Sequence, residues 1–246
     1  LLKLIIPFMV PLLIGNVFQQ LYNIADVVIV GRTIGVEALA TVGSVTPLFM
    51  MTMVLTIGLS NGCTVVTGQR YGAGDMGGMR RSIGTCTVLS VLFTLLIMLV
   101  FHMIIDPALV LMNIPPELLE DAKAYVMIIV DGLFAMMGYN LLSGIMRSLG
   151  DSKTPLYFLI VSSVVNIALA LFFILVLGWG VPGSAVALVI AQAISAILCL
   201  AYIYKRFPQL HLKRNDFNLD WPEVWAHLRM GLPMAVQFSV LGLGII

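Results

Sequence analysis

Long apolar stretches alternate with short polar interruptions along this chain, and the first stretch is long enough to cross a membrane. Residues 4–30 contain a single ionisable side chain, Asp26. A helix of that length rises about 40 Å, more than the hydrocarbon thickness of a bilayer. Further apolar stretches follow at 36–68, 82–105, 122–147, 155–177 and 182–204, and a seventh begins near residue 228. The pattern predicts an all-α polytopic membrane protein with six full spans and the start of a seventh.

The long polar stretch 205–227 divides the chain. We expect an N-terminal six-helix lobe at 1–204, a cytoplasmic inter-lobe linker at 205–227, and the truncated start of a second lobe at 228–246. Its mixed charges and two tryptophans fit either a solvated linker or an amphipathic interfacial segment. Residues 2–10 resemble residues 228–236, and six spans lie between them, so both copies enter from the same side. This repeat predicts a twelve-helix protein of two lobes related by an axis along the membrane normal.

Composition and charge agree with the membrane interpretation and exclude other classes. The chain is 60% hydrophobic and 10% charged, where a soluble domain carries roughly a quarter charged residues. Its formal charge of +1 suggests no nucleic-acid partner. The three cysteines lack metal-ligand spacing, and we expect them to be small buried hydrophobes. No nucleotide-binding motif suggests ATP, and no acid/base or metal constellation suggests an enzyme.

The basic residues are sorted to one side of the predicted membrane. Eleven of the 13 lysines and arginines fall before span one or in the loops after spans two, four and six. The long connection at 106–123 on the other side carries four acidic residues. By the positive-inside rule, this places the N-terminus in the cytoplasm of a multi-pass plasma-membrane protein.

A polar stripe runs along the first span. Gln19, Tyr22, Asn23 and Asp26 fall at i, i+3, i+4 and i+7, which puts them on one helical face. A lipid-facing helix would not carry this face, so we expect it to line a cavity. The amides could alternatively bond neighbouring helices. An intramembrane carboxylate is a functional hypothesis by default, because burying it in lipid is costly.

Span four carries the other intramembrane acid, Asp131, together with Tyr139 and Asn140. Asp131 could supply a second coupling carboxylate, bond polar groups between helices or reach outward to the interface. Asn140 lies nine residues further on, about 180° around a helix, so it cannot face the same cavity as Asp131. We expect Tyr139 and Asn140 to be polar groups of a substrate cavity.

Several segments together resemble the multidrug and toxic compound extrusion (MATE) transporters. Residues 26–43 resemble the family's signature from the first to the second span, and residues 69–74 and 147–155 resemble its loops after spans two and four. Asn166 on span five and residues 183–192 on span six, including Gln192, also fall at family motifs. Five motifs in the right order cover the whole chain.

The resemblance implies a twelve-helix exporter that works without ATP and transports a small cationic or amphipathic substrate. It also implies that no cofactor is needed beyond a coupling ion, H⁺ or Na⁺. It also implies a protein that works as a monomer once both lobes are present. One branch of the family builds a cation site from a span-one acid, an Asn and an Asp on span five, and a Thr on span six. Asp26 and Asn166 match the first two of these, whereas Ala170 and Leu188 occupy the other two positions.

These departures favour a site that relies on one protonatable acid over a four-ligand Na⁺ site. Burial favours the neutral form of a carboxyl group, so Asp26 can alternate between protonated and charged states during alternating access. Two other functions stay open from the sequence. A flippase for a lipid-linked glycan would want a basic cavity, whereas the spans offer acids and amides, and a channel would need a pore filter.

Overall fold

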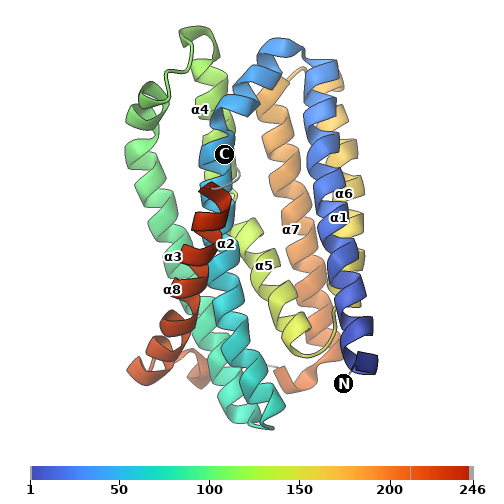
Figure 1. The fold of residues 1–246 in the computed structure, drawn as a ribbon, viewed down its shortest axis with the longest axis vertical. Helices are drawn as coiled ribbons and strands as arrows, with labels where there is room; N and C mark the ends of the chain where they lie inside the picture. The colour runs from blue at the N-terminus through green and yellow to red at the C-terminus, as the bar shows by residue number, and fades with distance from the viewer. Residues whose placement is uncertain (1, 211, 244–246) are drawn as a thin grey trace.

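The computed structural model describes residues 2–210 and 212–243, with side chains described outside 2–8, 22–23, 215 and 238–243. Long helices run along one axis and form a bundle in which the described residues contain no strand (Figure 1). The elements in order are α1 (Leu2–Thr33), α2 (Val36–Gly72), α3 (Met76–Leu111), α4 (Pro116–Asp131), α5 (Leu133–Ser148), α6 (Lys153–Leu171), the π-helix η1 (Phe172–Val176), α7 (Gly180–Arg206), the 3₁₀ turns η2 (Pro208–Leu210) and η3 (Arg214–Phe217), and α8 (Trp221–Leu243).

The helices confirm the all-α membrane fold predicted from hydropathy. Five of the described segments are long and apolar enough to cross a membrane: 9–33, α2, α3, 153–176 and α7. A sixth crossing is made if α4 and α5 are counted as one broken span. The final helix, α8, begins at Trp221, within the stretch expected to link the lobes.

The fourth span differs from its prediction as one continuous helix at 122–147. It begins at Pro116 and breaks at Gly132, where α4 and α5 meet at an angle of 44°. A Cβ atom on Gly132 would lie 2.2 Å from Cγ2 of Val189, so the glycine lets α7 approach the break closely. Backbone hydrogen bonds continue across the break, from Gly132 N–H to the Ile128 carbonyl and from Ala135 N–H to the Gly132 carbonyl. Apart from Asp131, the residues on both sides of the break are apolar, so hydropathy indicates one span and does not reveal the bend.

Two hydrophobic clusters form the interior. The larger cluster joins the outer parts of α3, α4, α6 and α7 to the end of α1 and includes Phe101, Tyr125 and Ile174. The second lies among α2, α3, α5 and α7 and contains all three cysteines, which are free and buried as expected. We call the end of the bundle that carries the α2–α3, α5–α6 and α7–α8 connections the basic end, because the exposed side chains of Arg81, Lys205 and Arg206 lie there.

The α2–α8 crossing brings two segments far apart in sequence into backbone contact (Figure 1). Gly58 and Gly62 on α2 face Gly231 and Ala235 on α8. A Cβ atom on Gly62 would lie 2.1 Å from Cα of Gly231, closer than any real contact. Pairs of small residues four apart allow such close packing in membranes, where helices gain little from hydrophobic burial against one another.

Adding one methyl group at this crossing should separate the helices. We expect Gly62→Ala to destabilise the protein by about 1–3 kcal/mol, the usual cost of overpacking. Gly43→Ala is the matched control, because a Cβ atom on Gly43 meets nothing within 4 Å. Thermal unfolding in detergent should show a lower midpoint for Gly62→Ala than for Gly43→Ala, and equal midpoints would show that the crossing is not tightly packed.

Candidate functional site

Asp26 and Asn166 lie at the same height in the bundle. Helices α1 and α6 both start at the basic end, run in the same direction and pack together (Figure 1). Gly15 is level with Leu156, whose Cδ1 would lie 3.7 Å from a Cβ atom at that glycine. Because both helices rise equally per residue, Asp26 is level with Ile167, the neighbour of Asn166.

Both side chains hold polar atoms that are buried without a hydrogen-bond partner among the described residues. Oδ1 of Asp26 is one such atom, and Asn166, which is 1% exposed, leaves both its amide nitrogen and its amide oxygen unpaired. Tyr125 on α4 lies close enough to Asp26 for the two groups to interact electrostatically. An unpaired buried polar group costs about 1–3 kcal/mol, so such a cluster is retained where it has a use.

The third helix of this region, α7, runs antiparallel to α6. The hydroxyl of Ser162 donates to the Ala191 carbonyl at 2.8 Å, and that of Ser195 donates to the Phe158 carbonyl at 3.2 Å. This register places Ala187, the neighbour of Leu188, level with Asn166. Gln192, whose Oε1 is also buried and unpaired among the described residues, lies about one turn nearer the basic end.

The two positions that depart from the family's cation site are apolar and buried. Ala170 is fully buried and Leu188 is 7% exposed, and both belong to the larger hydrophobic cluster. Among the residues whose side chains are described, Asn166 at the same height and Tyr125 are therefore the polar groups that the structure associates with Asp26. A proton needs a single acceptor, whereas a hard metal cation needs several oxygen ligands.

Asp131 lies on a different face of α4 from the one that meets Asp26. It follows Tyr125 by six residues on α4, which turns it about 120° away from the helix face that meets Asp26. Its Oδ1 lies 3.4 Å from Nε2 of His102 on α3, and both side chains are about half exposed. The structure therefore pairs Asp131 with His102 and does not bring it to Asn166.

The remaining predicted residues are spread along the bundle. Gln19 is half-buried on α1, near the height of Gln192, and the side chains of Tyr22 and Asn23 lie outside the described part of the structure. The Tyr139 hydroxyl donates to the Pro155 carbonyl at 3.4 Å, and the Asn140 amide donates to the Met136 carbonyl at 2.8 Å. These last two side chains bond their own helix or its neighbour.

A buried polar network at the basic end was not found from the sequence. His227 on α8 is fully buried and its Nδ1 lies 2.8 Å from the backbone carbonyl of Glu223, which can only accept. Nδ1 therefore carries a hydrogen, and in the neutral ring Nε2 accepts from the Ser82 hydroxyl at 2.8 Å. Ser82 on α3 in turn lies 2.9 Å from the Thr67 hydroxyl on α2.

An ion pair flanks this network. Nη2 of Arg70 donates to Oε2 of Glu223 at 2.6 Å, and its Nη1 lies 2.6 Å from Oε1 and donates to the Gly78 carbonyl. The network and the ion pair together join α8 to α2 and α3. Glu223 and His227 are four residues apart, and this spacing was the sequence signal for a paired histidine.

Burial lowers the pKa of His227, and the positive charge of Arg70 lowers it further, while the carbonyl and carboxylate of Glu223 oppose the shift. His227 precedes the expected seventh span, which begins near residue 228. The folded protein therefore favours the neutral ring that accepts from Ser82.

A bundle of membrane-spanning helices that encloses an unpaired acid and amides is the architecture of a polytopic membrane protein with an internal polar site. The family model described as MatE matches residues 11–172, and the chain belongs to this family of multidrug and toxic compound extrusion proteins. It is 32% identical to YoeA of Bacillus subtilis, a probable multidrug resistance protein, over 96% of this chain and 52% of that protein. The chain thus spans about half the length of the curated relatives it matches.

Solved structures of the family share the fold. One described as the outward-facing conformation of a multidrug resistance MATE family transporter matches with a TM-score of 0.91 and 29% identity over 99% of this chain and 54% of its own. An inward-facing conformation matches with a TM-score of 0.84 and 29% identity over 92% of this chain and 51% of its own.

The His227 network should make the folded protein less stable as the pH falls. Because the pKa of His227 is lower in the folded protein than in the unfolded chain, the unfolded chain takes up a proton first as pH falls through about 6.5. We expect the thermal midpoint in detergent to fall between pH 7.5 and pH 5. His227→Gln, which cannot titrate, should remove part of that fall, and an unchanged profile in the variant would contradict this assignment.

Proposed function

We propose that the whole protein is a secondary active antiporter that exports organic cations, drugs or other amphipathic compounds by alternating access. The names of the relatives support export of drugs, and the family's known structures are of transporters, not enzymes. The observation that carries the proposal is the carboxylate of Asp26. One of its oxygens is buried without a hydrogen-bond partner among the described residues, at the height of Asn166 and within electrostatic reach of Tyr125. Such a group is suited to bind and release an ion.

In this mechanism Asp26 is the coupling acid. The charged carboxylate is poorly solvated inside the lobe, so uptake of a proton removes a large electrostatic cost. Neutralisation lets α1 pack more closely on α6, and loss of the proton reverses this. Exchange of ion for substrate follows if one arrangement of α1 favours a cavity open to one side of the membrane and the other arrangement favours a cavity open to the opposite side.

We infer that the coupling ion is H⁺ rather than Na⁺. Ala170 and Leu188 bring no oxygen atoms to the site and are packed in the hydrophobic cluster. The carboxylate of Asp26 can take up a proton without them. Asn166 and Tyr125 then serve as hydrogen-bond partners of the acid in its two states.

The proposal also covers the residues that contact substrate, the membrane location and the oligomeric state. Gln19, Asn140 and Gln192 are candidates to contact substrate in the cavity. The asymmetry of basic residues supports the proposal that the basic end and the N-terminus face the cytoplasm in a plasma-membrane protein. We propose that the protein acts as a monomer with two lobes, because the internal repeat supplies the second lobe within one chain.

Asp26→Asn should abolish ion-coupled efflux while leaving membrane insertion intact, because the amide keeps the shape of the acid but cannot carry a charge. The measurement is the efflux of a cationic dye from everted vesicles made with the complete gene product. Asp121→Asn is the matched control, since this exposed acid on α4 undergoes the same chemical change. Undiminished coupled efflux in Asp26→Asn would refute its role.

Separately imposed gradients should identify the ion. In proteoliposomes we expect dye transport to follow a pH gradient and to be unaffected by a Na⁺ gradient at constant pH. Transport driven by Na⁺ alone would contradict the inference from Ala170 and Leu188, while leaving exchange itself intact.

A further inference from the structure

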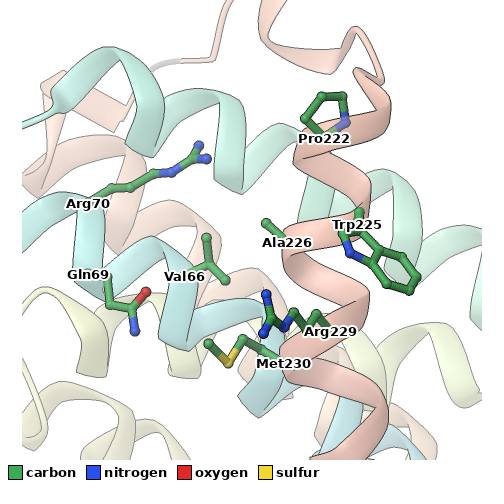
Figure 2. Close-up of a pocket in the computed structure, with 8 residues that line it drawn as sticks. All are labelled: Val66, Gln69, Arg70, Pro222, Trp225, Ala226, Arg229 and Met230. Atoms are coloured by element: carbon green, nitrogen blue, oxygen red, sulfur yellow. The ribbon is translucent and has the colours of Figure 1, made fainter.

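A cavity of about 570 Å³ opens between the end of α2 and the start of α8, at the basic end of the bundle (Figure 2). Its walls come from two helices that are far apart in sequence and are held together by the small-residue crossing described above. The lining residues are Val66, Gln69, Arg70, Pro222, Trp225, Ala226, Arg229 and Met230. None of these residues takes part in the proposed coupling site around Asp26.

The two arginines of this cavity are in different electrostatic states. Arg70 is neutralised by Glu223, which holds its guanidinium at 2.6 Å through both carboxylate oxygens. Arg229 is exposed and makes no ion pair with any described residue, and in Figure 2 its guanidinium extends from α8 toward α2. The cavity therefore carries one uncompensated positive charge, with the Gln69 amide available as a further donor.

The other walls suit a ligand that is part polar and part apolar. Val66, Ala226 and Met230 give the cavity an apolar surface beside the guanidinium of Arg229. The indole of Trp225 lies on the outer flank of α8 and stacks on Trp221, and both rings are exposed. Exposed tryptophans of a membrane protein are concentrated at the level of the lipid headgroups, so the cavity opens at that level.

We propose that this cavity binds the phosphate group of an acidic phospholipid from the leaflet at the basic end. The guanidinium of Arg229 donates to two phosphate oxygens, as arginine does where planar bidentate recognition is needed, and the Gln69 amide donates to a third. The glycerol backbone and first acyl carbons contact Val66 and Met230. A basic pocket between membrane helices is a recurrent form of lipid headgroup site.

The site has a structural consequence for the inter-lobe junction. A bound lipid would contact α2 and α8 at once, beside the ion pair that already joins them. It would therefore strengthen the attachment of the first helix of the second lobe to the N-terminal lobe. The proposal does not depend on the identity of the transported ion or substrate.

Native mass spectrometry of the complete gene product, released from nanodiscs, can test this binding. The nanodiscs contain phosphatidylcholine with or without phosphatidylglycerol. We expect wild-type protein to retain phosphatidylglycerol in preference to phosphatidylcholine, and Arg229→Gln to bind it about tenfold more weakly, since charge-assisted hydrogen bonds are lost. Arg81→Gln is the matched control, because it removes an equally exposed charge at the same end but outside the cavity.

Each further result decides the proposal. Equal lipid retention by Arg229→Gln and wild type would overturn it, as would an equal loss in Arg81→Gln, which would indicate attraction to the whole basic surface. Displacement of the lipid by millimolar inorganic phosphate would show a site for free anions and would overturn the assignment to lipid. Arg229→Lys should bind with intermediate affinity, because it keeps the charge but loses the planar fork.

Discussion

The close approach of α2 to α8 is the contact on which the basic end of this protein depends. In an apolar solvent, helices gain little by hiding leucines from lipid, so they associate where small residues let backbones touch. Gly62 and Gly231 provide that contact, and the consequences reach several residues toward the basic end. Beyond this contact, Glu223 on α8 reaches Arg70 on α2, and His227 on α8 reaches Ser82 on α3. The polar contacts at the basic end thus depend on the close packing of these small residues.

Two polar clusters in this structure illustrate opposite uses of buried hydrogen-bonding groups. Around His227 each ring nitrogen has a partner, and the network ties three helices together. Around Asn166 the amide has no partner among the described residues, and no charged group offsets Asp26 there. A network in which every polar group is paired contributes rigidity. A buried polar group that is left unpaired costs free energy, and a bound ion or proton can remove that cost. The difference explains why the first cluster is structural and the second is the candidate for coupling.

Much of the fold could be predicted from hydropathy, because a membrane requires each span to be long, apolar and helical. The same reasoning singled out Asp26 as a candidate, since a lone acid in an apolar run is rare, and its role stays a prediction. Contacts between distant segments were not visible. Ser82 and His227 lie 145 residues apart, and nothing local marks them as partners. The break at Gly132 was also missed, because the close approach of Val189, on another helix, to this glycine cannot be seen in the local sequence.

The position of α1 explains how a single charge could matter to the whole lobe under the proposed mechanism. Most of the large apolar side chains described on this helix, including Leu13, Val17 and Leu21, are exposed, and its main packing partner is α6. A helix held by one neighbour is displaced by a smaller force than a helix at the centre of a bundle. The inward carboxylate of Asp26 adds a desolvation cost when charged and removes it when protonated, and both changes act directly on the α1–α6 contact. Under the proposed mechanism, a change in the charge of Asp26 would therefore act on the position of a helix that packs mainly against one neighbour, α6.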